Sequence, residues 1–335
     1  MKERIAVIGA GSWGTTLAQL LAQRGHAVSL WAFEPEVRED IERQRENPVF
    51  LPGVRLSDRI APTNDLRASV DGAEAIVSAS PSQAVRRLWE HLAPAVPSGA
   101  IVISVTKGIE TDSLCTMTQV IRETVGEEKG LRLSVLSGPT FAKEVSAGLP
   151  SAAVAASEDC GAVRWIQLLF SGPSLRIYTG EDVLGVELGG ALKNVIALTA
   201  GISDGLGLGF SARAALLVRG MAEITRLGVA MGADARTFWG LTGFGDLVLT
   251  STGELSRNRT VGLRLGRGEK LQDILAGMKM VAEGVETTKA AKRLGEREGV
   301  ELPIIEQTYR VLFEGRGPRL ALQELMNREL REEFA

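Results

Sequence analysis

Residues Ile5–Leu21 read IAVIGAGSWGTTLAQLL, and this stretch predicts a strand, a tight turn and a helix in direct succession. The β-branched run at residues 5–8 passes into glycines at positions 9, 11 and 14 and then into leucines at helical spacing. Gly9 would permit the turn, Gly11 would let the backbone approach a pyrophosphate, and Gly14 would let the helix pack closely on the strand. The positive N-terminal end of that helix would face the anion.

A second β-like run, residues 27–33, follows the helix and ends beside Glu34, which lies twenty residues beyond Gly14. An acid at about this distance is expected to bind the ribose of a dinucleotide. The simpler alternative is a glycine-rich turn that binds nothing. The strand before the turn and the acid after it favour a dinucleotide site.

Composition limits the other classes of function. A chain of 335 residues is long enough for two domains. Its net charge is −3 and the charges of both signs are mixed, so we expect neither a nucleic-acid-binding nor a membrane-surface protein. No apolar run looks long enough to cross a bilayer, which predicts a soluble, cytoplasmic protein without an integral membrane segment. The two histidines and two cysteines fit no zinc spacing, so no metal site is expected.

Strand-like and helical stretches alternate through the first half of the chain. The further β-like runs are residues 73–79, 100–105, 131–136, 151–156 and 175–178, and the helical stretches are 36–45, 81–92 and 113–125. Residues 46–62, with three prolines, are expected to be irregular. This order predicts an α/β fold with a doubly wound, largely parallel Rossmann-like sheet. Ligands of such sheets bind beyond the carboxyl ends of the strands.

The pattern changes near Asp182, after which the apolar spacing is mainly helical. Glycine-rich turns are expected to interrupt the helices at residues 204–209, 241–245 and 266–268. We therefore divide the chain into a dinucleotide-binding domain, residues 1–185, and an all-α substrate and catalytic domain, residues 186–335.

Lys193 is the one charged residue in the apolar run LGGALKNVIAL, residues 188–198. Gly189 and Gly190 lie on its face of the helix, so it would stand in a groove of small residues with room for another group. One interpretation is a packed helix in which Lys193 reaches water or pairs with Glu187. The other is a partly desolvated ammonium group whose lowered pKa allows it to exchange a proton.

Three further polar positions belong with Lys193. Asp246 follows two glycines on an expected tight turn, where it is either a helix cap or a catalytic partner. Arg257 and Asn258 open a helical run and would form an anion site, although a solvated basic turn fits equally well. Lys107 follows a strand beside the expected cofactor crevice. Together these groups suggest a reductase that acts on a small phosphorylated carbonyl compound.

Six segments strengthen this interpretation, and they occur in the order IGAGSWGT, TKGIE, SGPTFAKEV, LGGALKNVIAL, GDLVLT and SRNR. From Ile5 to about Arg328 the chain strongly resembles the bacterial, soluble, NAD(P)-dependent glycerol-3-phosphate dehydrogenases. The resemblance implies a Rossmann domain followed by a helical domain. It also implies interconversion of dihydroxyacetone phosphate and sn-glycerol 3-phosphate for phospholipid synthesis, and a homodimer.

The resemblance also implies roles for individual residues. Lys193 matches the proton donor and acceptor of the family, and Lys107 and Asp246 would assist it. The cofactor positions are Gly9, Gly11, Ser12, Trp13, Gly14, Phe33, Glu34, Lys107, Ala142, Arg257, Val281 and Glu283. The substrate positions are Lys107, Gly138, Thr140, Lys193, Asp246, Ser256, Arg257 and Asn258.

One departure from the family pattern leaves the choice between NADP(H) and NAD(H) open. Many relatives have a basic or imidazole side chain where this chain has Phe33, and the neighbouring Glu34 would repel a 2′-phosphate. Arg38, one helical turn further on, would offset that repulsion.

Two alternatives remain. Another reductase of the same architecture, of the hydroxyacid or ketopantoate type, would share the glycine turn but not SGPTFAKEV and SRNR together. A non-catalytic dinucleotide sensor would have no use for an isolated Lys193 on an apolar helix. A turnover assay separates the sensor from an enzyme.

Overall fold

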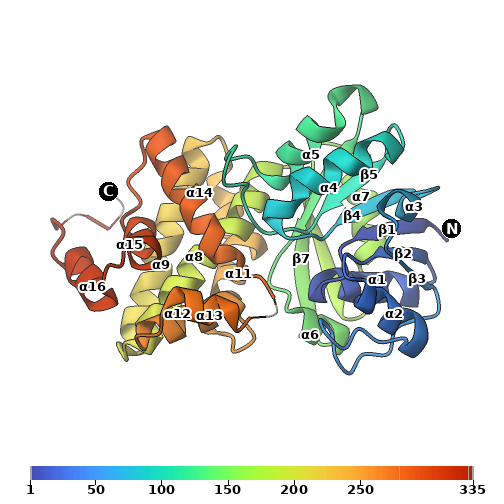
Figure 1. The fold of residues 1–335 in the computed structure, drawn as a ribbon. Coiled ribbons are helices and arrows are strands. Elements are labelled where there is room, and N and C mark those ends of the chain that lie inside the picture. The colour runs from blue at the N-terminus through green and yellow to red at the C-terminus, as the bar shows by residue number, and fades with distance from the viewer. Residues whose placement is uncertain (1, 279, 331, 334–335) are drawn as a thin grey trace.

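The computed structural model describes residues 2–278, 280–330 and 332–333. The chain forms a sheet-based part and a helical part that lie side by side (Figure 1). The first part is drawn in blue to green and the second in yellow-green to red. The change from one to the other falls between the last strand, which ends at Gly180, and a long helix that begins at Val183. That helix runs through the predicted boundary between residues 185 and 186, and the division at that point stays a prediction.

Eight strands form one sheet in the order β3-β2-β1-β4-β5-β6-β7-β8. The strands are β1 (Arg4–Ile8), β2 (Ala27–Trp31), β3 (Ile60–Thr63), β4 (Ala75–Ser78), β5 (Ile101–Ser104), β6 (Arg132–Ser137), β7 (Ser151–Ser157) and β8 (Leu175–Gly180). All neighbouring pairs are parallel except β6 and β7, which are antiparallel. The predicted largely parallel sheet is confirmed.

Helices cover both faces of this sheet. They are α1 (Ser12–Gln23), α2 (Pro35–Gln44), α3 (Leu66–Ser69), α4 (Val85–Leu92), α5 (Met117–Val125), α6 (Ala142–Ser146) and α7 (Cys160–Phe170). Strand β1 contributes alternate side chains to the two faces, because successive side chains of a strand point to opposite sides. Ile5 and Val7 join the core beneath α1 and α7, whereas Ala6 and Ile8 join the core beneath α4 and α5.

The irregular region expected at residues 46–62 contains the start of a strand that the sequence did not reveal. Strand β3 pairs with β2 alone, in parallel, with Pro62 opposite Leu30. A proline lacks an N–H group and is tolerated where the strand lies at the edge of a sheet. Two helices begin later than expected: residues 82–84 form a 3₁₀ turn before α4, and Thr116 caps α5.

The second half contains the helices α8 (Val183–Gly205), α9 (Gly209–Ala230), α10 (Ala235–Phe238), α11 (Asp246–Thr252), α12 (Arg257–Gly266), α13 (Leu271–Ala276), α14 (Glu283–Glu298), α15 (Pro303–Phe313) and α16 (Pro318–Met326). Helix α8 is its central element and packs against α9, α11, α12, α14 and α15 (Figure 1). One expected break is wrong, because residues 241–245 form a π-helical turn that leads directly into α11. Helical backbone structure therefore continues from residue 241 into α11, which begins at Asp246.

The expectation that no apolar run is long enough to cross a bilayer is also wrong on length. Helix α8 has 23 residues and is apolar enough to pass that test, but 83% of its most apolar window is buried inside the protein. Its apolar character is explained by its place at the centre of the helical part, where neighbouring helices cover it on several sides.

Glycines bring α12 into direct contact with α8. A Cβ at Gly201 of α8 would collide with the carbonyl oxygen of Arg259, and one at Gly262 of α12 would collide with that of Leu198. The two helix backbones therefore touch, which places the beginning of α12 beside the middle of α8. This contact brings the SRNR segment next to Lys193.

Candidate functional site

A cleft of about 1190 Å³ lies between the carboxyl ends of the strands and the helical part. Most of the predicted site residues line it. They are Gly9, Gly11, Ser12, Trp13, Phe33, Glu34, Lys107, Thr140, Ala142, Lys193, Asp246, Ser256, Arg257, Asn258, Val281 and Glu283. Gly14 and Gly138 are outside this lining, among the residues that the structure describes. The cleft thus brings together groups from both halves of the chain.

The glycine turn has the geometry of a pyrophosphate-binding loop. Gly9 has φ +121°, and a Cβ there would lie 2.8 Å from the carbonyl oxygen of Ala79. A Cβ at Gly14 would collide with the carbonyl oxygen of Gly9, so Gly14 allows α1 to pack closely on the turn. A Cβ at Gly11 would meet nothing within 4 Å, because this residue faces the open cleft.

The start of α1 fits an anionic ligand. No side chain caps its first turn, which leaves the N-terminal end of the helix dipole facing the cleft. The buried indole Nε1 of Trp13 has no hydrogen-bond partner in the described part of the chain. Ser12 is already engaged: its Oγ lies 2.6 Å from the carbonyl oxygen of Phe50 and 3.2 Å from the sulfur of Met280. The residues present therefore fit a dinucleotide, with Ser12 joining the two halves of the chain beside it.

The centre of the cleft holds a carboxylate between two ammonium groups. Lys193 Nζ donates to Asp246 Oδ1 at 3.1 Å and to Thr250 Oγ1 at 2.6 Å. Lys107 Nζ donates to Asp246 Oδ2 at 2.7 Å and to the carbonyl oxygen of Gly138 at 2.9 Å. Asp246 thus joins a lysine of the sheet-based part to a lysine of α8.

Burial controls the electrostatics of this cluster. Burial, the largest cause, and the charge of Lys107 lower the pKa of Lys193, whereas Asp246 raises it, and the net pKa is about 8. Burial by itself would raise the pKa of Asp246, but the two lysines outweigh that effect and hold it below its usual value. Lys193 is therefore an ammonium group that can release a proton near neutral pH.

Glu187 is not the partner of Lys193. Its Oε1 accepts from the backbone N–H of Thr118 at 2.8 Å, and its Oε2 accepts from the hydroxyl of the same residue at 2.5 Å. Glu187 therefore anchors α8 to the first turn of α5, and the interpretation in which it pairs with Lys193 is wrong.

The groove of small residues around Lys193 is filled by protein. A Cβ at Gly190 would lie 2.8 Å from Ser137 Oγ, and one at Gly189 would lie 3.4 Å from the carbonyl oxygen of Thr242. The glycines make room for the end of β6 and for the π-helical turn. We expected these glycines to leave room for something beside the helix. In the structure the chain itself, at the end of β6 and in the π-helical turn, fills that room.

The beginning of α12 forms one wall of the cleft. Ser256 caps the helix, since its Oγ accepts from the N–H of Arg259 at 3.2 Å. Arg257 donates from Nη1 to the carbonyl oxygen of Val281 at 2.6 Å and lines the cleft. Arg259 points elsewhere, where its guanidinium pairs with Asp204 at 2.7 Å. The two arginines of SRNR thus have different environments.

Asn258 is held in place by neighbouring helices. Its Nδ2 donates to Asn194 Oδ1 at 2.9 Å, and its Oδ1 accepts from the N–H of Gly284 at 2.9 Å. Asn194 in turn donates to the carbonyl oxygen of Lys107 at 3.4 Å. This chain of amides connects α12, α8 and the strand end that bears Lys107.

Glu283 contacts the opposite half of the chain. Its carboxylate accepts from the N–H of Ser82 at 3.0 Å and from the hydroxyl of Ser82. It lies in the cleft lining, as a cofactor position should, but its hydrogen bonds join α14 to the connection after β4.

Two residues of the central cluster were missed by sequence analysis. Thr250 lies one helical turn after Asp246 and contacts it at 3.1 Å as well as Lys193. Asn194 directly follows Lys193 and lines the same cleft. The i, i+4 spacing in GDLVLT is the signal that would have identified Thr250, because residues at that spacing lie on one helix face.

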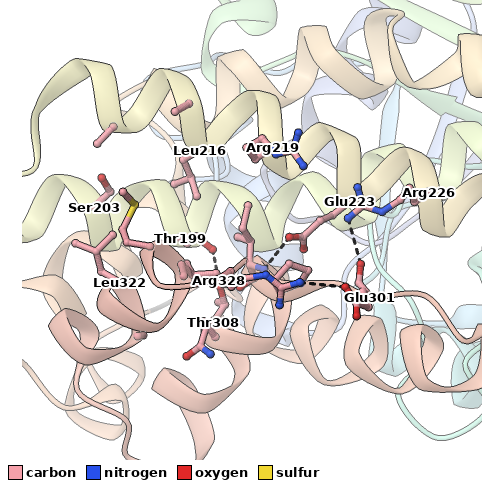
Figure 2. Close-up of a pocket in the computed structure, with 18 of the residues that line it drawn as sticks. Thr199, Ser203, Leu216, Arg219, Glu223, Arg226, Glu301, Thr308, Leu322 and Arg328 are labelled. Atoms are coloured by element: carbon pink, nitrogen blue, oxygen red, sulfur yellow. Dashed lines mark hydrogen bonds and ion pairs between the residues drawn. The ribbon is translucent and has the colours of Figure 1, made fainter. Parts of the chain in front are cut away.

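A second hollow lies away from all of the predicted residues. It is a groove of about 1230 Å³ with walls from α8, α9, α15 and α16. Figure 2 shows Arg226 and Arg328 turned toward Glu301 at one end of this groove. The buried Glu223 lies nearby, and its carboxylate accepts from the N–H groups of Ile304 and Ile305 at the start of α15.

Comparison with known proteins identifies the family. Residues 4–163 match the model of the NAD-dependent glycerol-3-phosphate dehydrogenase N-terminus, and residues 182–323 match that of the C-terminus. The chain belongs to the NAD-dependent glycerol-3-phosphate dehydrogenase family. It is 55% identical to the Geobacter sulfurreducens glycerol-3-phosphate dehydrogenase [NAD(P)+] over 333 residues, which cover 99% of each chain. The Syntrophobacter fumaroxidans enzyme of the same name is 50% identical, over 98% of this chain and 97% of its own.

Solved structures agree with this membership. The glycerol-3-phosphate dehydrogenase of Coxiella burnetii matches with a TM-score of 0.94 and 36% identity, over 98% of this chain and 99% of that one. A ketopantoate reductase from Ralstonia eutropha matches with a TM-score of 0.60 and 16% identity, which shows a shared fold alone. The family members are NAD(P)-dependent oxidoreductases, so the sensor and the other reductase types are the weaker interpretations.

Two of the three glycines of the turn, Gly11 and Gly14, allow a matched test of cofactor binding. We expect Gly11→Ala to fold normally, because its backbone is extended and a methyl group there meets no protein atom. It should nevertheless weaken NADH and NADPH binding by about tenfold or more, since the methyl group would stand where a pyrophosphate approaches. Gly14→Ala should instead lower the melting temperature, because its methyl group collides with Gly9. Isothermal titration and thermal unfolding measure the two effects, and unchanged binding by folded Gly11→Ala would contradict the assignment.

Proposed function

We propose that this chain reduces dihydroxyacetone phosphate to sn-glycerol 3-phosphate, reversibly, with NADPH or NADH, and that Lys193 is the proton donor. The observation that supports this most is the cluster of Lys193, Asp246 and Lys107 in the same cleft as the glycine turn. A dinucleotide loop, a titratable ammonium group and an anion-binding wall are the parts that this reaction requires.

The nicotinamide, when bound, supplies a hydride to the C2 carbonyl carbon. Negative charge then develops on the carbonyl oxygen, and the ammonium group of Lys193 would stabilise that charge and donate the proton. Lys107 adds a second positive charge near this oxygen. Asp246 orients both lysines and raises the pKa of Lys193, which keeps that residue protonated until the reaction requires the proton.

The substrate phosphate would bind at the start of α12. Arg257 supplies a guanidinium group and the helix end supplies backbone N–H groups, both of which favour a phosphate. The amide of Asn258 uses one of its two N–H groups for Asn194, so it would offer the other to the substrate. Ser256, Thr140 and Gly138 would complete the substrate positions. Binding the phosphate at a distance from the reacting carbon orients that carbon toward Lys193.

The dinucleotide would lie along the sheet-based wall of the cleft. Gly9, Gly11 and Trp13 would contact its pyrophosphate side, with Ser12 and Gly14 shaping the turn. Ala142, Val281 and Glu283 would be further cofactor positions, as the resemblance implies. We further propose that the protein works in the cytoplasm, where it supplies glycerol phosphate for phospholipid synthesis.

We also propose a homodimer, which the resemblance implies. The groove between α9 and α16 supports this, because Val229 and Met326 in its lining leave 47% and 76% of their surface exposed. Large exposed apolar side chains that gather in one place mark interaction sites. A second copy of this chain would cover them through a self-complementary contact.

The first prediction from the proposed function concerns turnover. Purified protein should oxidise NADPH or NADH on addition of dihydroxyacetone phosphate. The loss of absorbance of the reduced nicotinamide measures this oxidation. Lys193→Ala should lose about 10²-fold or more of kcat, because general acid catalysis contributes on that order. Its dinucleotide affinity should stay within about twofold of the wild type. Lys289→Ala on the surface of α14 serves as the control, and full activity in Lys193→Ala would refute the assigned role.

The second prediction concerns pH. Reduction requires protonated Lys193, so kcat for reduction should fall as pH rises through about 8. Oxidation of glycerol 3-phosphate requires the neutral amine and should rise over the same interval. Asp246→Asn removes the charge that raises the pKa of Lys193, so the falling limb should move to lower pH. Profiles of kcat against pH, measured at saturating substrate, test this prediction. If the falling limb of Asp246→Asn stays at the pH of the wild type, a group other than Lys193 titrates.

The third prediction concerns assembly. Val229→Glu places a charge in the groove, so a dimer formed there should dissociate into monomers. Leu168→Glu, at an exposed position on α7 of the sheet-based part, provides the matched control and should leave the mass unchanged. Sedimentation equilibrium distinguishes the two. A monomeric wild type, or a dimer that survives Val229→Glu, would exclude this surface.

A further inference from the structure

The part of the cleft at the corner after β2 has its own charged groups. Three elements border it: the corner after β2, the segment around α3 and the helix α4. The residues that line this end are Phe33, Glu34, Asp65, Leu66, Arg67, Ala84, Arg87, Leu88 and His91. In a Rossmann sheet the corner after the second strand binds the adenosine ribose, which is where NADH and NADPH differ.

Glu34 lines the cleft, and its carboxylate does not cap its own helix. Glu34 is the N-cap residue of α2, but its side chain makes no capping hydrogen bond. Among the described residues the carboxylate forms neither a hydrogen bond nor an ion pair, although the residue lines the cleft. A carboxylate in this position is a strong acceptor for ribose hydroxyl groups.

Asn64 fixes the corner that carries Glu34. Its Nδ2 donates to the carbonyl oxygen of Ala32 at 2.7 Å and to that of Glu34 at 3.4 Å. The carbonyl oxygen of Asn64 accepts from Trp31 Nε1 at 3.0 Å. The backbone on either side of Phe33 is therefore held by one side chain from the neighbouring edge of the sheet.

Arg38 does not offset the charge of Glu34, and the expectation that it would is not supported by its contacts. Its guanidinium donates to Glu42 at 2.5 Å and lies 3.7 Å from Glu39, both on its own helix. Arg38 is also not part of the cleft lining, within the residues that the structure describes. Arg38 therefore does not compensate the charge of Glu34.

We propose that Glu34, held by Asn64, makes the cleft select NADH over NADPH. This inference rests on the proposed function, since it concerns the cofactor of that same reaction. The carboxylate would accept hydrogen bonds from the 2′- and 3′-hydroxyl groups of NADH, whereas the 2′-phosphate of NADPH would bring a second negative charge against it. Asn64 acts as a positioning residue, because it determines where the carboxylate stands.

Arg67 and Arg87 provide the competing arrangement. They lie on α3 and α4 and line the same cleft as Glu34, and Arg67 Nε already donates to the carbonyl oxygen of His91 at 3.3 Å. If these arginines bound a 2′-phosphate, NADPH would be preferred in spite of Glu34. The experiment below separates the two arrangements.

Equilibrium binding without substrate tests the proposal. Isothermal titration of the wild type should give NADH a dissociation constant about tenfold or more below that of NADPH. Glu34→Gln removes the charge. It should reduce the ratio of the NADPH dissociation constant to the NADH dissociation constant by about tenfold, mainly through tighter NADPH binding. Asn64→Ala should lower the ratio while the net charge stays the same. Arg38→Gln is the matched control on the same helix and should leave the ratio unchanged.

Three outcomes would overturn the proposal: tighter binding of NADPH by the wild type, an unchanged ratio in Glu34→Gln, or a loss of NADPH binding alone in Arg67→Ala and Arg87→Ala. The ratio of kcat/KM values with dihydroxyacetone phosphate provides a second readout, which should follow the binding ratio. If neither cofactor is oxidised although both bind, the proposed function fails while the binding ratio still decides the selectivity.

Discussion

The buried carboxylate of Asp246 is the group on which the rest of the site depends. It binds Lys193 of α8 with one oxygen and Lys107 of the sheet-based part with the other. Removing one partner from a buried set of charges leaves an uncompensated charge, which is costly. The two halves of the chain are therefore joined at this cluster, and neither half alone contains all of the groups that we propose to be catalytic.

Close packing of backbones places the other groups around this cluster. Contacts at Gly201 and Gly262 bring α12 against α8, and the amides of Asn258 and Asn194 connect the two helices beside Lys107. The proposed phosphate-binding end of α12 and the proposed proton donor, Lys193, are thus held together by these contacts. Such preorganisation allows binding energy at the phosphate to orient the reacting carbon.

The sequence was most informative where structure depends on neighbours in the chain. The glycine turn, the alternating strands and helices, and the apolar run around Lys193 were all visible in it, and the sheet, helices and family follow as expected. Sequence analysis failed where the surroundings of a residue in the fold determine its secondary structure or its partners. Pro62 looked like a loop residue but lies in an edge strand, and Arg38 looked available but pairs within its own helix. Edge position and side-chain partners depend on elements that are distant in the chain.

The sequence by itself determined the fold class, the dinucleotide turn and the candidate lysines, because periodicity and glycine geometry are local properties. Only the tertiary structure decided which group Lys193 contacts. Its partners Asp246 and Thr250 lie 53 and 57 residues away, whereas the nearer Glu187 binds α5 instead. The structure also decided that burial lowers the pKa of Lys193 to about 8. Desolvation and charge pairing depend on what surrounds a side chain in space, which a linear sequence does not specify.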